Sequence, residues 1–334
     1  MISKRALVTA ACVAAAAVVT GFIAYYGIHE KKPREFRLVY IPKTLDTTND
    51  FWIYMMEGCR KAAEDYGAQL EVMVPESELD IEGQKELIRE AVSERPDAIL
   101  LTPSTMEENE DLKNARDSGI FVTFIDSYAE GGYEKLLVAT DNVEAGKTLG
   151  SYAASLIEPG TQIAVVSHVK DTSTSGEREE GFREGLGGQA DQIVETVYCN
   201  SSYELAYDLA EKLMEKYPDL GLIAGMNEYS STGAARAVDD HGKAGKIKVV
   251  GIDSSEEMVR LMEKGVFQGI VVQRAFKMGY LGVEQTIKRL TNHNTGESFI
   301  NSGSELVTRE NMYDEDFAKL IFPFDWQRTE SPWE

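Results

Sequence analysis

Two short stretches of the chain resemble each other, and each carries an aspartate followed by a serine. The first is VTFIDS at residues 122–127, and the second is VVGIDS at residues 249–254. Each predicts a buried parallel strand with a carboxylate at its C-terminal end, which is the end where open α/β sheets bind ligands. We therefore expect two similar lobes, whose residues Asp126 and Asp253 converge on one cleft. Two such acids can accept hydrogen bonds from the hydroxyls of one small polar molecule.

The segments around both aspartates alternate between strand and helix patterns, which is typical of parallel sheets covered by helices on both faces. In the first half, strands are expected at 36–41, 69–74, 98–101 and 121–125, with helices at 51–66, 81–93 and 107–119. After 136–141 the alternation restarts, with strands at 162–167, 192–198, 221–224, 249–252 and 269–272 and helices at 145–157, 177–186, 203–216, 231–241, 256–264 and 275–291. The end, 300–333, is expected to be irregular apart from a short strand at 305–307.

Composition narrows the class of protein. A chain of 334 residues is long enough for about two domains. The net charge of -22 argues against nucleic-acid binding, because a protein that binds phosphates needs a basic face. The three cysteines do not form a framework of paired disulfides, and they do not identify the cellular compartment.

The N-terminus is more informative about location. Residues 6–28 contain no charge and follow Lys4 and Arg5, and this run is long enough to cross a bilayer as a helix. We expect an uncleaved anchor that holds one large domain on the extracytoplasmic face of the cell membrane. Two alternatives remain: a cleaved signal, which would make the protein secreted, and lipid attachment at Cys12.

A set of further motifs occurs in order along the chain. These are IPKT at 41–44 leading to NDFW at 49–52, FID at 124–126, DN at 141–142 with Gly146, SGEREEGF at 175–182, GMNE at 225–228, VVGID at 249–253, and Gln273. Together they resemble the type I periplasmic sugar-binding proteins, the ribose- and galactose-binding group, over residues 36–324. Each motif alone is weak, whereas the ordered set is specific.

The resemblance implies a fold and a way of working. The fold would be α/β, with two Rossmann-like lobes joined by three crossings and a ligand held between them by hinge closure. After an anchor and linker at 1–35, we expect one lobe at 36–140 plus 275–302 and the other at 141–272 plus 305–325. No cofactor and no metal is implied, and we expect a monomer.

The residue types in these motifs suit a sugar, which has a weakly apolar face and a fringe of hydroxyls. Planar polar groups would bind the hydroxyls and flat aromatic rings would cover the face. The candidate contacts are Asn49, Asp50, Phe51, Trp52, Asp126, Ser127, Arg178, Tyr203, Asn227, Asp253 and Gln273. Ser127 stands where close relatives of the ribose-binding type carry an arginine, and this departure argues against ribose itself.

Each candidate also has a purely structural interpretation. Asp126 and Asp253 could cap the helices that follow them, and Arg178 could pair with neighbouring glutamates on the surface. Asn227 could turn the chain, Gln273 could cap a helix, one of Phe51 and Trp52 is expected to pack in the core, and Tyr203 is balanced between the two interpretations.

An enzyme is the first competing class. The four histidines are scattered without metal-ligand spacing, and no G-x-G-x-x-G follows a strand. A sugar-responsive repressor would need a DNA-binding head, where this chain has an apolar segment. We therefore expect a binding protein that delivers a monosaccharide or sugar-like ligand to an ABC permease, with a tethered sensor that signals to a membrane kinase as the alternative.

Overall fold

The computed structural model describes residues 35–292 and 296–321. Both of its sheets belong to the compact unit Arg37–Glu334. The apolar segment at 6–28, on which the predicted membrane anchor depends, lies outside the described residues. Within the described part, no helix is both long and apolar enough to cross a membrane.

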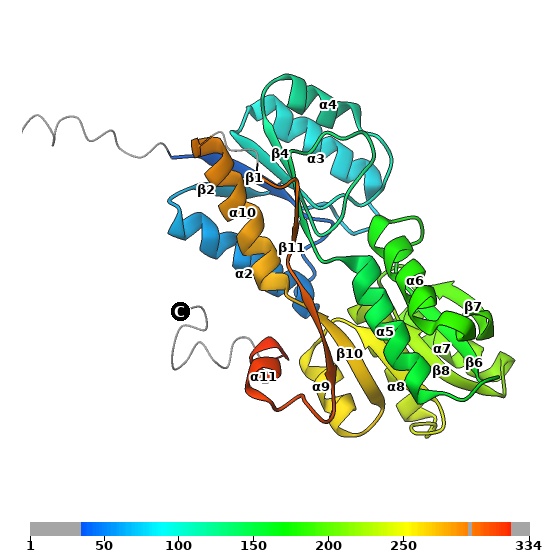
Figure 1. Cartoon of the computed structure of the whole chain (residues 1–334). Coiled ribbons are helices and arrows are strands. Elements are labelled where there is room, and N and C mark those ends of the chain that lie inside the picture. The colour runs from blue at the N-terminus through cyan, green and yellow to red at the C-terminus, as the bar shows by residue number, and fades with distance from the viewer. Residues whose placement is uncertain (1–34, 293–295, 322–334) are drawn as a thin grey trace, which may run out of the picture. The chain divides into compact units, whose positions relative to one another are not determined.

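The first sheet is parallel throughout and is covered by helices on both faces. Its strands are, in spatial order, β11 (Phe299–Asn301), β5 (Leu136–Ala139), β4 (Phe121–Ile125), β3 (Ala98–Leu101), β1 (Arg37–Ile41) and β2 (Gln69–Val72). Helices α2 (Asp50–Asp65) and α10 (Ala275–Asn292) pack together on one face, and α3 (Ile81–Glu94) and α4 (Glu110–Asp117) on the other (Figure 1). Cover on both faces explains why the central strand β3 is buried along its whole length.

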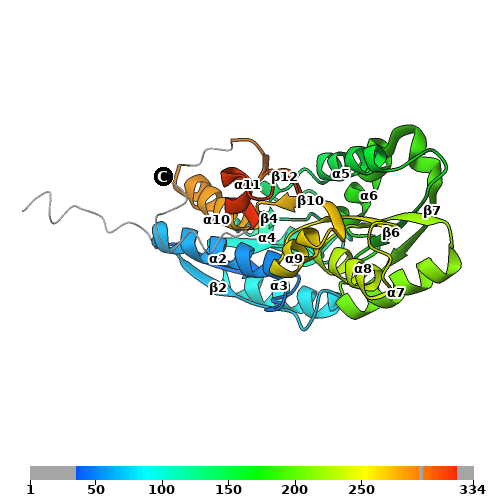
Figure 2. The same ribbon diagram turned by 90° about the horizontal axis from the view of Figure 1, so that it is seen from below.

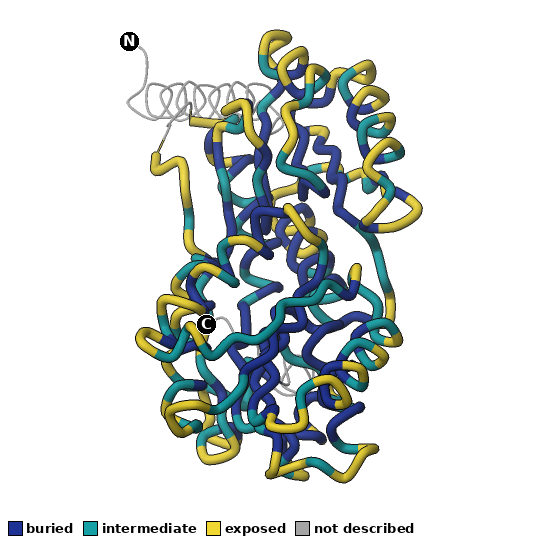
Figure 3. Tube along the Cα trace, turned by 90° about the vertical axis from the view of Figure 1, so that its right-hand side faces the viewer, coloured by how far each residue is buried: buried dark blue, intermediate teal, exposed yellow. Residues whose placement is uncertain are grey.

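The second sheet repeats this plan with one antiparallel edge strand. In spatial order it contains β12 (Ser304–Thr308), β10 (Phe267–Gln273), β9 (Lys248–Ile252), β8 (Leu220–Gly225), β6 (Gln162–Ser167) and β7 (Ile193–Tyr198), with β12 antiparallel to β10. Helices α5 (Asn142–Leu156) and α6 (Ser173–Leu186) cover one face (Figure 2), while α7 (Tyr203–Lys216), α8 (Glu228–Asp240) and α9 (Glu256–Glu263) cover the other. A 3-10 turn, η1 (Gly187–Gln192), follows α6, and α11 (Glu315–Ile321) ends the described chain. Figure 3 shows the buried strands at the centre of each layered unit.

The chain passes between the sheets at short connections that bond to one another. These are the links from β5 to α5, from β10 to α10 and from β11 to β12. The Ser302 amide donates to the Ala139 carbonyl at 2.9 Å, and the Arg274 amide donates to the Gly303 carbonyl at 3.3 Å. Few residues therefore have to absorb a change in the angle between the lobes, as in a hinge.

The predicted fold class, two α/β lobes with largely parallel sheets, is confirmed for the described residues. One expectation about the chain end was wrong: 300–333 is not irregular apart from one strand, because β11 completes the first sheet and α11 follows β12. A strand of three residues and a helix of seven are too short to show a clear hydrophobic period. The lobe boundaries expected from the sequence, 36–140 plus 275–302 and 141–272 plus 305–325, stay a prediction.

Several helices begin at a capping residue that the hydrophobic pattern does not reveal. Helix α6 begins a turn earlier than predicted, because Thr172 accepts a hydrogen bond from the Ser175 amide. Helix α8 also begins earlier, because Asn227 and Ser230 form a capping box. These two starts matter for function, since both helices point their first turns toward the cavity described below.

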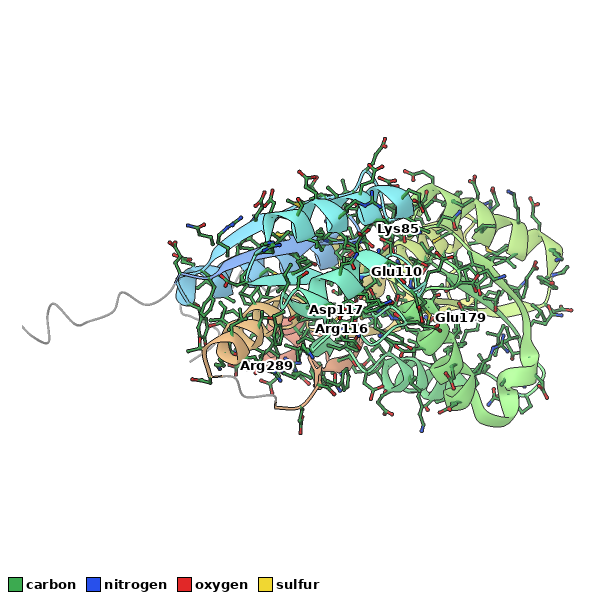
Figure 4. All side chains as sticks on the ribbon, turned by 90° about the horizontal axis from the view of Figure 1, so that it is seen from above. Lys85, Glu110, Arg116, Asp117, Glu179 and Arg289 are labelled. Atoms are coloured by element: carbon green, nitrogen blue, oxygen red, sulfur yellow. The ribbon has the colours of Figure 1, made fainter. Side chains whose placement is uncertain are left out.

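The outer helices carry much of the charge. Lys85 lies on α3, and Glu110, Arg116 and Asp117 lie on α4 (Figure 4). Arg116 bonds Asp117 at 3.1 Å, in contact with solvent. Exposed pairs of this kind contribute about 0–1 kcal/mol each, so they favour solubility more than they hold the fold.

Helices α5 and α6 approach so closely that only glycine fits at their contact. A Cβ atom on Gly146 of α5 would lie 2.3 Å from the backbone oxygen of Arg178 on α6. Gly181 on α6 faces α5 in the same way, with the Val143 oxygen 2.0 Å from the position of a Cβ. The glycines thus fix the position of α6, the helix that carries Arg178.

We predict that Gly146→Ala destabilises the protein by about 1–3 kcal/mol, because the added methyl group forces the two helices apart. Gly176→Ala is the control, since Gly176 lies on the partner helix α6 with open space around its Cβ position. Alanine there is expected to stabilise by about 0.5–1 kcal/mol. Urea unfolding measures both, and an unchanged midpoint for Gly146→Ala would contradict the packing.

Candidate ligand-binding site

The two aspartates singled out in the sequence occupy equivalent positions in the two sheets. Asp126 directly follows β4, and Asp253 directly follows β9. Their φ angles are 70° and 77°, in the left-handed region that residues other than glycine rarely adopt. Each amide donates to the neighbouring strand, at 2.9 Å to the Val138 and Val271 carbonyls respectively. Strain of this kind costs about 1–3 kcal/mol and tends to persist at functional sites.

Both aspartates line one cavity, to which both sheets contribute. The empty space inside the cavity, open solvent included, is about 330 Å³. It is lined by Lys43, Asn49, Phe51, Trp52, Glu78, Asp126, His168, Thr174, Arg178, Asn227, Tyr229, Asp253 and Gln273. Eight of these were candidates from the sequence: Asn49, Phe51, Trp52, Asp126, Arg178, Asn227, Asp253 and Gln273.

Asp253 is held by donors from the end of the neighbouring strand β10 and from the first residue of helix α8. One carboxylate oxygen accepts from the Gln273 side chain at 2.7 Å, and the other accepts from the Glu228 amide at 2.9 Å. Burial raises the pKa of Asp253, while the nearby Arg178 charge and these hydrogen bonds oppose the rise. Asp253 does not cap the following helix α9, because Ser255 does so.

Arg178 reaches the cavity from the second turn of α6. Its Nε donates to the Asn142 side chain at 2.8 Å, and its Nη1 donates to the Met226 carbonyl at 2.8 Å. The side chain is buried, so the alternative in which Arg178 pairs with glutamates on the surface was wrong. Arg178 lines the same cavity as Asp253, and its positive charge opposes the rise in the pKa of that acid.

On the first-sheet side, Asp126 is paired with a lysine that sequence reasoning missed. Lys43 Nζ lies 3.4 Å from Asp126 and 3.9 Å from Glu78, and the lysine side chain is only 2% exposed. A buried lysine is stable only when it is paired in this way. The missed signal was its position: Lys43 follows β1 by two residues, so it lies at the same edge of the sheet as Asp126.

Two aromatic rings from the start of α2 form one wall. Phe51 and Trp52 meet edge to face, with ring centroids 5.1 Å apart, and both line the cavity. Trp52 is also buried, so it packs in the core while it forms the wall. Asn49 caps α2 by accepting from the Trp52 amide at 3.4 Å, and Asn227 caps α8 in the same way. Both asparagines therefore combine a helix cap with a place in the cavity wall.

Three sequence candidates stand outside the cavity lining. The Ser127 hydroxyl donates to the Pro103 carbonyl at 3.0 Å and is buried there. The Asp50 amide donates to Glu228, and the Tyr203 hydroxyl donates to the same glutamate at 2.7 Å. The Tyr203 hydroxyl also accepts from the Asn49 side chain at 3.4 Å, so Asp50 and Tyr203 both contribute to contacts between the lobes and not to the cavity wall.

These contacts indicate that the lobes are closed. The Glu228 carboxylate accepts from the Asp50 and Phe51 amides at the start of α2, at 3.4 and 3.3 Å. Tyr229 on α8 donates to the Asp46 carboxylate at 2.7 Å. Burial, followed by the negative charges of Asp253 and Asp50, raises the pKa of Glu228 to about 8.

A larger groove lies near the hinge and shares Gln273 with the cavity. Of its charged groups, Arg274 pairs with Glu305 at 3.2 Å, and Lys319 pairs with Glu315 outside the lining at 2.7 Å. The smaller cavity combines buried charges, donors and rings in one place, so it is the candidate site. Among the described residues, no cluster of three or more His, Cys, Asp or Glu is placed to hold a metal ion.

The sequence can also be compared with known protein families and with related proteins. Residues 39–294 match the model of a family described as the periplasmic binding protein domain. A D-ribose/D-allose-binding protein of Pseudomonas aeruginosa is 24% identical over 301 residues, covering 86% of this chain and 94% of that protein. The ribose import binding protein of Bacillus subtilis is 25% identical over 252 residues, covering 75% and 80%.

Solved structures agree with this comparison. A sugar transporter from Clostridium phytofermentans is 40% identical, with a TM-score of 0.77, covering 82% of this chain and 100% of that one. An ABC transporter solute-binding protein from Agrobacterium vitis with bound D-fucose is 28% identical, with a TM-score of 0.81, covering 86% and 100%.

The raised pKa of Glu228 predicts a pH effect on stability. The folded protein holds this proton up to pH about 8, whereas an unfolded glutamate releases it near 4.5. The folded state therefore binds more protons between these values, and the stabilisation present below pH 4.5 is lost as the pH rises through 8.

We predict that Glu228→Gln reduces this loss of stability with rising pH, because the amide resembles the protonated acid. The measurement is urea unfolding across the interval, compared with Glu215→Gln, an exposed position on α7. Parallel pH profiles for wild type and Glu228→Gln would contradict the assigned pKa shift.

Proposed function

The chain belongs to the periplasmic binding protein domain family, and from that premise we propose that it captures a small neutral sugar between its lobes. The family is one of binding proteins, so the chain is not an enzyme, as predicted. The observation that carries the proposal is the pair Asp126 and Asp253. They come from the ends of equivalent strands in two sheets, and they meet at one cavity.

The groups around the cavity suit a ligand with many hydroxyls. Carboxylates accept hydrogen bonds, Lys43 and Arg178 donate, and the amides Asn227 and Gln273 do both. The Oε1 atom of Gln273 is buried without a hydrogen-bond partner among the described residues, so it is open to a ligand hydroxyl. Phe51 and Trp52 offer flat surfaces to the apolar face of a sugar ring.

The charge balance argues for a neutral ligand. Three acids, Glu78, Asp126 and Asp253, face two cations, Lys43 and Arg178, around the cavity. The cations are therefore already needed to offset buried carboxylates. A phosphate or a carboxylate on the ligand would add an uncompensated negative charge, so sugar phosphates and uronic acids should be excluded.

The names of the relatives support the ligand class. Relatives are described as binding proteins for ribose and allose, and solved structures of solute-binding proteins contain D-arabinose and D-fucose. We propose a monosaccharide of this size for this chain. Ser127 donates to the Pro103 carbonyl and stands outside the cavity lining, so the position where relatives of the ribose-binding type carry an arginine contributes no side chain to the cavity wall.

For the role in the cell, we propose delivery of the captured sugar to an ATP-driven importer at the extracytoplasmic face of the membrane. The closed state, held in part by the Glu228 contacts to α2, would be the form that the permease receives. The site residues, the lobe boundaries and the monomeric state belong to this proposal.

A tethered sensor is the second candidate, and the uncharged segment at 6–28 favours it, because delivery usually relies on diffusible or lipid-tethered proteins. Deletion of the gene separates the two roles. Loss of uptake of the radiolabelled sugar would indicate transport. Intact uptake with loss of the sugar-induced transcriptional response would indicate sensing.

We predict that one or a few neutral monosaccharides raise the thermal unfolding temperature of the full-length protein in mild detergent. A sugar at about 100 times its Kd stabilises the folded state by about 2.7 kcal/mol. The panel contains ribose, allose, arabinose, fucose, galactose and polyols, with ribose 5-phosphate and galacturonate as charged controls. A shift caused only by the charged sugars, or by none, would contradict the proposal.

We predict that Asp253→Ala weakens binding of the active sugar by at least about 100-fold, because it removes the acceptor from ligand hydroxyls and leaves the charge of Arg178 without an acid beside it. Asp219→Ala, at an exposed turn, is the control and should bind like wild type. Titration calorimetry measures both, and circular dichroism checks that the variant is folded. Unchanged affinity in a folded Asp253→Ala variant would show that the site is assigned wrongly.

A further inference from the structure

A histidine and a threonine, His168 and Thr174, lie on the second-sheet side of the cavity. His168 directly follows β6, and Thr174 lies in the first turn of α6. Both line the cavity, and His168 Nε2 lies 2.9 Å from Thr174 Oγ1. His168 is 3% exposed, so its ring is fixed between the protein interior and the cavity.

One ring nitrogen of His168 lacks a partner. Nδ1 is buried and has no hydrogen-bond partner among the residues that the structure describes. Burial, followed by the positive charges of Arg178 and Lys43, holds the pKa of His168 well below its ordinary value. The ring is therefore neutral, so one nitrogen donates and the other accepts.

A series of hydroxyls indicates which nitrogen accepts. The Thr172 hydroxyl has acceptors in the Val169 carbonyl at 3.0 Å and the Ser175 hydroxyl at 3.1 Å, which leaves the Thr172 oxygen as an acceptor for the Thr174 hydroxyl at 3.5 Å. We infer that Thr174 Oγ1, 2.9 Å from His168 Nε2, then accepts from Nε2–H. In this arrangement every hydroxyl donates in the same direction, and Nδ1 is the unprotonated acceptor of a ring that lines the cavity.

The opposite side of the cavity supplies a donor. Lys43 carries three N–H groups and can only donate. Asp126 accepts from one of them at 3.4 Å, while Glu78, at 3.9 Å, pairs with the lysine charge without a hydrogen bond. Lys43 and His168 both line the cavity, from opposite lobes, and the lysine charge is among the causes that lower the pKa of His168. A hydroxyl between them would accept from Lys43 and donate to His168, and it would join the two lobes.

We propose that His168 is a specificity-determining residue, whose Nδ1 accepts a hydrogen bond from one sugar hydroxyl that also accepts from Lys43. This inference rests on the proposed sugar binding and adds a requirement for one hydroxyl at a defined position. A ligand with hydrogen, an ether or a carboxylate there cannot donate, and it would leave Nδ1 unpaired in a buried place.

Titration calorimetry on the full-length protein tests the requirement, with the sugar that gives the largest thermal shift as the probe. His168→Phe should bind about 10- to 100-fold more weakly, because the phenyl ring has no acceptor. His168→Asn should retain most of the affinity, since its amide can place an oxygen near the position of Nδ1. His241→Asn is the control, because His241 pairs with Glu211 at the surface.

Deoxy analogues of the same sugar identify the hydroxyl. For one of them, wild type and His168→Phe should bind with equal affinity, because the hydroxyl that His168 contacts is already missing. For the other deoxy analogues, the difference between the two proteins should remain. Equal effects of His168→Phe on every analogue would overturn the inference.

Nitrogen-15 NMR of the sugar-bound wild-type protein measures the tautomer of His168 directly. The His168→Asn variant is needed only to assign the His168 signals. The expected spectrum shows Nε2 protonated and Nδ1 unprotonated. A protonated Nδ1, or wild-type affinity in His168→Phe, would overturn the role of His168 while sugar binding stands. Absence of binding by wild type to every neutral sugar would overturn the proposed function, and this inference with it.

Discussion

The pairing of buried charges between two sheets is the interaction on which the structure depends. Asp126 and Asp253 sit at strand ends where little water reaches them, and each needs donors to remain there. Lys43 serves the first, and Gln273, the Glu228 amide and the nearby Arg178 serve the second. These partners come from different strands and helices. The order of strands in each sheet and the close contact of α5 with α6 are therefore what place them beside the aspartates.

The same constraint explains how closure can be sensitive to a ligand. A site that holds three acids and two cations in a small volume has donors and acceptors left over, among them Gln273 Oε1 and His168 Nδ1. A neutral polyol can satisfy them without adding charge. Direct contacts between the lobes, such as Glu228 with the start of α2, stabilise the closed form without ligand, so the ligand has to supply only the remaining part of the closure energy.

The sequence was sufficient for the fold class and for most of the cavity wall, because alternating strand and helix patterns and strand-end polar residues are local signals. The rule that strand ends carry the site identified Asp126, Asp253 and Gln273. Applied equally to β1 and β6, it would also have identified Lys43 and His168, which follow those strands. Glu78 was not accessible in this way, because it lies in a loop whose path depends on tertiary contacts.

The remaining differences also have physical causes. Asp50 and Tyr203 belong to the closed contact around Glu228, which exists only when two lobes distant in sequence meet. Short elements such as β11 and α11 depend on neighbours already in place, since neither is long enough to form alone. Helices α6 and α8 begin after the capping residues Thr172 and Asn227, and the hydrophobic periodicity of the sequence does not predict such caps.

The most direct measurement is a crystal structure of the protein with the neutral sugar that stabilises it most. The sugar is expected in the cavity between the sheets, with hydroxyls within hydrogen-bond distance of both Asp126 and Asp253 and a ring face against Phe51 or Trp52. A sugar bound in the groove near Arg274 and Phe317, or one that contacts the aspartate of only one lobe, would contradict the claim that paired strand-end acids from two sheets form the site.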